Sequence, residues 1–433
     1  MGCYTPLTRC TRMSDSLNRV LAVWNNHTLI GELRESNNLW QFEYDPQWTD
    51  FDLCPSLPIG TRQMIDGASL RPVQWFFDNL LPEGGARELI SRDAKINKAD
   101  SFGLLLEFGA ESAGALTLLP PGERPGTGIT RPFTHEALSE SIRNLPNFPL
   151  TAGTHKKMSL AGAQHKLPVI FEDCQLYAPD ESYPSSHILK PDHPDTNKYE
   201  HTAANEWFVM RLAEALKLSV PPVDLLSVPE SVYLIERFDR SKVTGSPKRI
   251  HAIDACQVLS IDRIFKYREC NADTLDRLIT LTRSRAETRQ RLFCWLLFNI
   301  LVGNNDDHLK NLSFFPDGDR LVLTDHYDLL STTVYAPNDG WELEQTTWPV
   351  GQAQNYSQID INCIHQLAQS LKVPKSYVDR TIKRYCSQIC ALADSLIAEH
   401  SASDQPGLAK AGQQRLLRKI RYGVINDMVG QLT

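Results

Sequence analysis

The residues in this sequence that are best suited to chemistry lie in one loop and at the end of the strand that follows it. The loop contains Asp306 and, five positions later, Asn311. Seventeen residues beyond Asn311, a short apolar run ends in Asp328. An aspartate, an asparagine and a second aspartate in this order are typical of a kinase-type phosphoryl-transfer site. We predict that Asp306 is the base beside the attacking hydroxyl, and that Asn311 and Asp328 hold Mg²⁺ against the phosphates of ATP.

Such a site also needs a cation for the phosphates and a seat for adenine. Lys190 ends a predicted strand and is expected to reach the α- and β-phosphates. Glu206, early in the next predicted helix, is a candidate to pair with Lys190 as a kinase helix glutamate pairs with its strand lysine. The backbone of Glu236–Phe238 lies where two lobes would join and is expected to hydrogen-bond adenine. His308 and Lys310 would either contact phosphate or stabilise the loop, and the sequence leaves both possibilities open.

A loop of small residues precedes the first strand of this region and is the expected phosphate-covering loop. It is not GxGxxG, so its position along the chain carries the prediction more than its composition does. Ser159, at its edge, is either a turn residue or a phosphorylation target. The loop residues are Ala161, Gly162, Ala163, Gln164, His165 and Lys166.

The elements that must position these residues follow from the hydrophobic patterns. Strands are predicted at residues 20–24, 28–31, 167–171, 187–190 and 232–238. Helices are predicted at residues 73–81, 100–108, 203–216, 274–282, 287–302, 359–371, 375–399 and 408–428. The fold class is therefore α+β, with a two-lobed protein-kinase-like fold. We predict a disordered extension at 1–18, a β-rich subdomain at 19–150, an α/β N-lobe at 151–245 and an all-helical C-lobe at 246–433.

Composition excludes several other classes of protein. The 433 residues include 45 basic and 52 acidic side chains, for a net charge of −7, which argues against a protein that wraps nucleic acid by itself. The ten cysteines show no CxxC pair, which favours reduced thiols in a cytoplasmic protein. The longest apolar run, Leu292–Val302, is too short to span a membrane and is expected to be a buried helix.

The net charge averages two unlike regions. Residues 306–360 hold ten acidic against two basic side chains, which suits a metal-binding cleft. Residues 361–433 hold ten basic against five acidic side chains. This basic excess is either a set of solvated helix faces or a secondary contact to DNA phosphates that assists a partner.

Together these motifs resemble the HipA family, the serine/threonine kinase toxins of bacterial toxin–antitoxin modules. The resemblance covers most of the chain. It rests on Val23–Asn26, Phe76–Pro82, Ser112–Leu118, Ala161–Gln164, Glu236–Arg240, Asp306–Ser313 and Tyr327–Asp328. His165 stands where the family commonly has a glutamate, and Asp307 where it has a small residue.

The resemblance implies an ATP- and Mg²⁺-dependent kinase that acts with a HipB-like helix-turn-helix antitoxin on operator DNA. It implies an aminoacyl-tRNA synthetase as the protein substrate, glutamyl-tRNA synthetase first, with growth arrest and persistence as the result. Ser159 would be an inhibitory autophosphorylation site. The nucleotide-binding residues carried over by motif are Ala161–Lys166, Lys190, Glu236, Arg237, Phe238, His308, Lys310, Asn311, Tyr327 and Asp328.

Two other functions compete with this interpretation. One is a catalytically silent, kinase-shaped corepressor in a DNA-bound complex, but Lys190, Asp306, Asn311 and Asp328 are all intact. The other is a metal-dependent hydrolase built on Asp306, Asp307 and His308, which would need further ligands at helical spacing.

Overall fold

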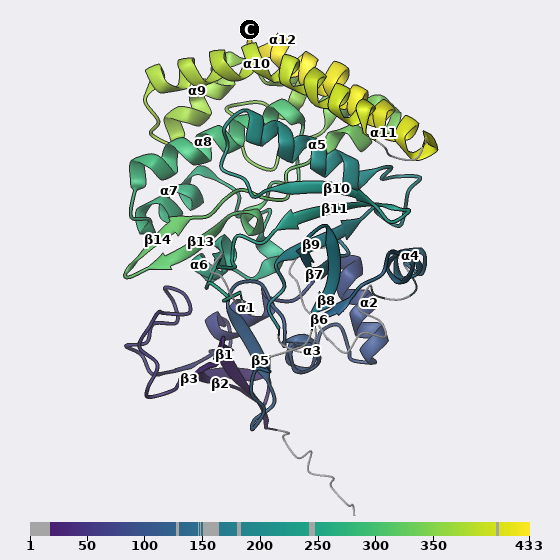
Figure 1. The fold of residues 1–433 in the computed structure, drawn as a ribbon. Coiled ribbons are helices and arrows are strands. Elements are labelled where there is room, and N and C mark those ends of the chain that lie inside the picture. Colours follow the sequence, from purple (N-terminus) through teal and green to yellow (C-terminus); the bar gives the residue numbers. More distant parts are fainter. Residues whose placement is uncertain are drawn as a thin grey trace, which may run out of the picture.

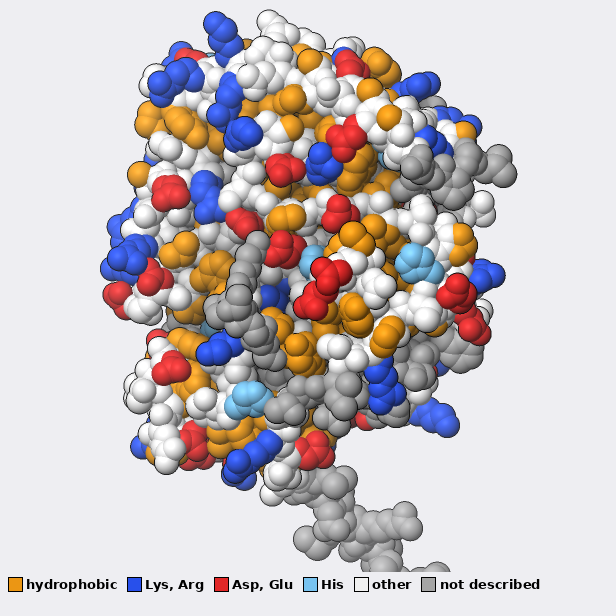
Figure 2. All heavy atoms as spheres, viewed as in Figure 1, with side chains coloured by type: hydrophobic (Ala, Val, Ile, Leu, Met, Phe, Trp, Pro, Cys, Tyr) orange, Lys and Arg blue, Asp and Glu red, His pale blue; other side chains and the backbone are white. Residues whose placement is uncertain are grey.

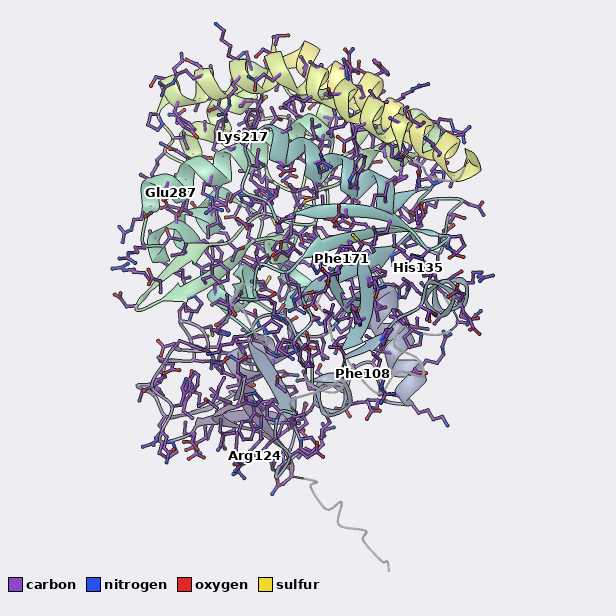
Figure 3. The ribbon with its side chains drawn as sticks, in the orientation of Figure 1. Phe108, Arg124, His135, Phe171, Lys217 and Glu287 are labelled. Carbon is purple, nitrogen blue, oxygen red and sulfur yellow. The ribbon has the colours of Figure 1, made fainter. Side chains whose placement is uncertain are left out.

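The molecule consists of an N-terminal sheet, a central sheet and a largely helical C-terminal region, which follow one another from bottom to top in Figure 1. The computed structural model describes residues 18–126, 130–145, 147, 149, 164–179, 183–241, 247–403 and 407–433. The predicted extension at 1–18 lies almost wholly outside the described residues. The labelled side chains of Figure 3 mark these regions, with Phe108 and Arg124 in the lower part, Phe171 in the central sheet and Glu287 among the helices.

The N-terminal unit, residues 19–119, is built on an antiparallel five-stranded sheet in the order β4-β3-β2-β1-β5. The predicted hairpin at its start is present, and Asn26 takes a positive φ of 52° at the turn, a conformation that asparagine tolerates. The strands are β1 (Arg19–Asn25), β2 (Thr28–Ser36), β3 (Leu39–Tyr44), β4 (Gln63–Ile65) and β5 (Leu116–Leu119).

Three helices complete this unit: α1 (Pro72–Asp78), α2 (Gly84–Ala94) and α3 (Ser101–Phe108). The sequence predicted α1 and α3. In the structure, Pro72 lies in the first turn of α1, and the Asp100 side chain caps the start of α3. It missed α2, which begins with two glycines that are poor helix formers. Packing of its buried residues, among them Leu89 and Ile90, stabilises α2 instead.

The central sheet has six strands in the order β10-β11-β9-β7-β8-β6. Helix α4 (His135–Arg143) packs Leu138 into the apolar cluster of this sheet, which includes Val169 and Leu234. Both β6 and α4 precede residue 150, where a subdomain boundary was predicted, yet β6 is a strand of the central sheet and α4 packs against it. The strands are β6 (Thr130–Pro132), β7 (Leu167–Glu172), β8 (Gln175–Pro179), β9 (His187–Pro191), β10 (Val223–Ser227) and β11 (Ser231–Glu236).

Helices dominate the C-terminal region, but they are not alone there. A small sheet of three strands lies within it, so the prediction that the C-lobe is all-helical is wrong in this detail. These strands are β12 (Ile253–Asp254), β13 (Ser313–Asp317) and β14 (Arg320–Leu323). Helix α5 (Thr202–Ala215) belongs to the preceding lobe and packs on β10 and β11 of the central sheet. The helices of the C-terminal region are α6 (Ala255–Leu259), α7 (Ala272–Leu281), α8 (Arg285–Val302), α9 (Ile361–Ser370), α10 (Lys375–Ala402), α11 (Gly407–Lys419) and α12 (Asn426–Leu432).

Helix α8 runs through the middle of the core, and every residue from Leu292 to Val302 is buried, as predicted. Within the described part of the chain, no helix is both long and apolar enough to cross a membrane. The mixed fold in two lobes, with a further N-terminal unit, confirms the predicted fold class.

A buried cluster of charges fastens the N-terminal unit to the central sheet. Glu111, at 0% exposure, accepts from Arg237 Nη1 and Arg240 Nη2 at 3.0 Å each and also pairs with Arg249. The Asp239 carboxylate accepts hydrogen bonds from Arg237 Nη2 and from the backbone N–H of Gly114, each at 2.7 Å. Because β11 ends just before Arg237, this cluster also holds the segment that connects the two lobes.

Replacing Glu111 should therefore destabilise the whole fold. Glu111→Gln keeps the shape but leaves the three guanidinium groups one counter-charge short, which should lower the free energy of unfolding by about 3 kcal/mol. Denaturant titration followed by tryptophan fluorescence measures this. The matched control is Glu88→Gln, an exposed glutamate paired with Lys98, which should leave the denaturation midpoint where it was. Equal midpoints for both variants would contradict the role of the cluster.

Candidate active site

A pocket of about 760 Å³ lies where the central sheet, the C-terminal region and the N-terminal unit meet. Its size is in the range of small-molecule and cofactor sites. Lys190, Glu206, Asp306, Asn311 and Asp328 all line it, so the structure brings together the residues that the sequence singled out. On the face drawn in Figure 2, acidic side chains gather near the middle of the molecule.

Lys190 is held at the centre of an ion network that joins the lobes. It comes from β9, is 3% exposed, and its Nζ lies 2.6 Å from Glu206 Oε1 of α5. The same Nζ bonds to Asp328 Oδ1, which arrives from the segment after β14. Lys166 Nζ lies 3.5 Å from the other oxygen of Asp328. The structure thus places Glu206, the predicted partner of Lys190, in contact with that lysine.

The charges of this network balance, since two ammonium groups face two carboxylates. Burial would raise the pKa of Asp328, but the charges of Lys166 and Lys190 outweigh burial and hold the pKa of that carboxyl below its usual range. Asp328 is consequently ionised at neutral pH. An ionised carboxylate beside two cations is the arrangement that a polyphosphate and its metal ion require.

The loop that carries Asp306 starts from a sharp turn at the end of α8. Gly303 ends the helix with a φ of +63°, and a Cβ there would collide with the Thr333 hydroxyl oxygen, so only glycine fits. Asn304 then accepts a hydrogen bond from the backbone N–H of Asp306 at 3.1 Å. Asn311 Nδ2 donates to the carbonyl oxygen of Asp306 at 3.0 Å, which closes the loop.

The two adjacent aspartates have different surroundings. Asp306 lines the pocket, and burial raises the pKa of its carboxyl while a hydrogen bond from the Tyr267 hydroxyl lowers it. Asp307 is 4% exposed and does not line the pocket, and its burial raises the pKa of that carboxyl well above its usual value. Of the two, only Asp306 is placed to reach a substrate hydroxyl.

Asn311 and Asp328 fit Mg²⁺ as partial ligands. The amide nitrogen of Asn311 is used within the loop, so Oδ1 is the atom that can reach a cation. Mg²⁺ prefers such hard oxygen donors and is usually held by one or two carboxylates together with substrate phosphates and water. Among the described residues, no group of three or more His, Cys, Asp or Glu side chains is placed to hold a metal ion. A hydrolase metal centre on Asp306, Asp307 and His308 is therefore not supported in this part of the chain.

The expected adenine seat has apolar walls. Ile188 of β9 and Ile235 of β11 line the pocket beside Phe238, whose ring lies 5.5 Å from that of Tyr327. Tyr327 is fixed by its hydroxyl, which donates to the Lys310 carbonyl oxygen at 2.8 Å. These groups provide a flat, apolar surface of the kind that a purine base packs against.

Two of the residues predicted to bind the nucleotide use their side chains for contacts with other parts of the protein. The guanidinium of Arg237 is committed to Glu111 and Asp239, so any contact with a nucleotide would be made by its backbone. Lys310 Nζ is buried and lies 2.7 Å from Asp254 Oδ2 and 2.8 Å from Asn79 Oδ1. Of the two possibilities left open by the sequence, the structure favours loop stabilisation for Lys310.

His308 is buried beside this lysine and packs edge-on against the Tyr267 ring, with centroids 4.9 Å apart. Burial, aided by the charge of Lys266, lowers the pKa of its imidazole to about 3, so His308 is neutral. It therefore brings no positive charge to the pocket at neutral pH.

The phosphate-covering loop is described only in part. Gln164 and Lys166 line the pocket, and His165 lies between them in the chain. Ser159, Ala161, Gly162 and Ala163 lie outside the described residues.

Sequence reasoning missed Tyr267 and the polar groups that the N-terminal unit contributes. Tyr267 precedes Asp306 by 39 residues, and Asn79 precedes Lys310 by 231. Neither distance along the chain corresponds to a local periodicity, so no pattern in the sequence could have indicated these contacts.

A sheet lysine paired with a helix glutamate, above a loop that presents Asp306, Asn311 and Asp328, defines a protein-kinase-like fold and site. The chain belongs to the HipA family. The family model described as the HipA-like C-terminal domain matches residues 158–393, and the HipA N-terminal domain matches residues 21–119.

Curated relatives agree with this assignment, and a solved structure has a similar fold. The chain is 33% identical to "Putative kinase Y4mE" of Sinorhizobium fredii over 73% of this chain and 78% of that protein. It is 29% identical to "Serine/threonine-protein kinase toxin HipA" of Shewanella oneidensis over 75% and 77% of the two chains. The fold is similar to that of a chain in the structure of the Shewanella oneidensis HipA, HipB and operator DNA complex, with a TM-score of 0.76, 24% identity, and 95% of this chain and 99% of that chain covered.

The contacts of Lys310 predict that its loss affects folding more than nucleotide binding. Lys310→Met leaves the buried Asp254 carboxylate without its cation and should lower the free energy of unfolding by about 3 kcal/mol. Lys383→Met, at an exposed position on α10, is the control and should leave the denaturation midpoint unchanged. An unchanged midpoint for Lys310→Met together with weaker ATP binding would instead make Lys310 a phosphate ligand.

Proposed function

We propose that this chain is a toxin serine/threonine protein kinase that transfers the γ-phosphoryl group of ATP to a serine of a target protein. The observation that carries the proposal is the meeting of Lys190, Glu206, Asp328, Asp306 and Asn311 in one pocket, although they come from separate elements. The relatives named as kinases support the same class of reaction.

The proposed chemistry assigns one role to each group. The serine oxygen attacks the γ-phosphorus, the bond from that phosphorus to the β–γ bridging oxygen breaks, ADP leaves, and the serine proton passes to Asp306. Lys190, oriented by Glu206, binds the nucleotide phosphates. Asn311 and Asp328 would hold Mg²⁺, which when bound neutralises charge on the β- and γ-phosphates.

The partners we propose follow the family. A HipB-like helix-turn-helix antitoxin would bind this chain and carry it to operator DNA, and an aminoacyl-tRNA synthetase, glutamyl-tRNA synthetase first, would be the substrate. Modifying that enzyme would arrest translation and growth and lead to persistence. The similar Shewanella structure is a complex of HipA, HipB and operator DNA, and this likeness supports the antitoxin and the DNA as partners.

The basic C-terminal helices are the proposed secondary contact to DNA phosphates. Arg380, Lys383 and Arg384 of α10 and Arg415 and Arg418 of α11 are exposed, so they are available for such a contact. Figure 2 shows lysine and arginine side chains spread over the upper part of the molecule, where these helices lie.

Asp306→Asn should abolish phosphoryl transfer and leave ATP binding intact, because the amide cannot take the serine proton but keeps the shape of the loop. Incubation with Mg-ATP followed by mass spectrometry detects phosphorylated protein, and calorimetry measures the affinity for ATP. Asp307→Asn is a matched control one residue away: burial favours the neutral acid at Asp307, so the amide should be tolerated and activity kept.

Activity of Asp306→Asn within tenfold of the parent would contradict the assigned base. A parent chain that gains no phosphate would favour the silent corepressor, and one that consumes ATP without labelling protein would favour a hydrolase. Comparing the phosphoproteomes of cells that express the parent and Asp306→Asn chains identifies the target.

We also propose that Ser159 is autophosphorylated and that this lowers the affinity for ATP. A phosphate there adds a charge of about −1.5 to −2 close to the expected phosphate loop, so it should repel the triphosphate. Mass spectrometry of tryptic peptides locates the phosphate, and calorimetry compares the phosphorylated parent with Ser159→Ala. Equal ATP affinities in the two proteins would contradict the proposal.

A further inference from the structure

The carboxylate of Asp306 has a partner that the proposed reaction does not use. The hydroxyl of Tyr267 donates a hydrogen bond to Asp306 Oδ1. Tyr267 follows the short helix η1 (Arg263–Phe265) and lines the same pocket, with 46% of the residue exposed. A tyrosine hydroxyl at the proposed base could either orient the carboxylate or occupy the place of the substrate hydroxyl.

The surroundings of Tyr267 hold it firmly in this position. Its ring packs edge-on against His308 of the loop, and Lys266 Nζ lies 5.1 Å from the ring centroid. The carbonyl oxygen of Lys266 accepts from the Leu309 N–H at 3.4 Å and from the Cys270 thiol at 3.0 Å. The segment that presents Tyr267 is therefore bonded to the loop that presents Asp306.

The N-terminal unit anchors this segment from the other side. Glu83, the residue that precedes α2, places Oε2 2.7 Å from Lys266 Nζ. Asp78, at the end of α1, places Oδ2 2.9 Å from Arg263 Nε and is itself held by Arg87 at 2.9 Å. Two carboxylates of the N-terminal unit thus hold the first residue of η1 and the residue that follows η1.

We propose that Tyr267 is a positioning residue that holds the Asp306 carboxylate in its working orientation, and that the N-terminal unit keeps Tyr267 in place through Glu83 and Lys266. The inference rests on the proposed kinase function. The terminal torsion of an aspartate is broad, so a carboxylate without a partner rotates away from the line of attack. With Oδ1 fixed by Tyr267, Oδ2 is the oxygen left to receive the serine proton.

Firm anchoring from two sides favours this role over that of an occluding group. A group that must leave to admit the substrate would be expected to sit on a segment with few contacts. Tyr267 instead follows two residues, Arg263 and Lys266, that form ion pairs with the N-terminal unit. The carbonyl oxygen of Lys266 also accepts hydrogen bonds from the Leu309 N–H of the loop and from the Cys270 thiol. The inference gives the N-terminal unit a function in catalysis, although it contributes none of the groups proposed to react.

Tyr267→Phe tests the positioning role, because it removes only the hydroxyl. The full-length chain is incubated with Mg-ATP, and the rate of phosphate incorporation into the chain is followed at several ATP concentrations. We expect kcat to fall about tenfold, with KM for ATP within about twofold of the parent, because orientation of the base is lost while nucleotide binding is kept. The thermal midpoint should not change.

Tyr422→Phe is the matched control. Tyr422 is 58% exposed and has a cation on its ring, Arg421 at 4.8 Å, as Tyr267 has Lys266, but it lies on the C-terminal helices away from the pocket. Its kcat should equal that of the parent.

A second variant tests the part played by the N-terminal unit. Glu83→Gln alone should lower kcat, and the double variant with Tyr267→Phe should lose no more than Tyr267→Phe alone, because both act through one hydroxyl. Losses that multiply would show that Glu83 acts by another route, through Lys310 at 3.8 Å, and would overturn that part of the proposal.

The outcomes separate this inference from the proposed function. If the parent transfers phosphate and Tyr267→Phe matches or exceeds its kcat, Tyr267 does not position the base, and the kinase assignment stands. A gain in kcat would identify Tyr267 as an occluding group. If the parent transfers no phosphate while binding ATP, both the function and the inference fail.

Discussion

The rest of this structure depends on one buried ammonium group. Lys190 is almost wholly removed from solvent and must be paired, and the chain provides a carboxylate from each direction, Glu206 on α5 and Asp328 from the C-terminal region. An unpaired charge at this depth would cost several kcal/mol, so the lobes cannot separate fully without that penalty. The network therefore fixes the spacing between the central sheet and the segment proposed to hold Mg²⁺.

A second set of ion pairs connects the N-terminal unit to the same centre. Glu111 holds the segment after β11 through three arginines, and Glu83 and Asp78 hold the residues around Tyr267. The unit is therefore more than an appendage to a kinase-like fold. It contacts the pocket at both the expected adenine edge and the loop of Asp306, and those contacts are charged, directional and buried or nearly so.

Much of the fold could be predicted because its signals are local. The hairpin turn at Asn26, the apolar run of α8 and the strand before Lys190 each carry a pattern of a few residues that admits one structure. The misses have physical reasons as well. Helix α2 starts with two glycines, and β12 is only two residues long, so both exist through tertiary contacts that no local pattern records. In the sequence, only the spacing to Asn311 favoured Asp306 over Asp307 as the base. In the structure, Asp306 lines the pocket, whereas Asp307 is buried and does not line it.

The sequence by itself determined which chemical groups are present and in what order, because an aspartate, an asparagine and a second aspartate after a lysine-ended strand are properties of the chain. Only the tertiary structure decided which of those groups share a pocket and which are committed to structural ion pairs. The sequence assigned Arg237 to the adenine edge through its backbone and left open whether Lys310 contacts phosphate or stabilises the loop. The structure shows that both side chains bond to carboxylates from distant parts of the chain. Tyr267 gave no signal at all, because its contact with Asp306 exists only when segments 39 residues apart are folded against each other.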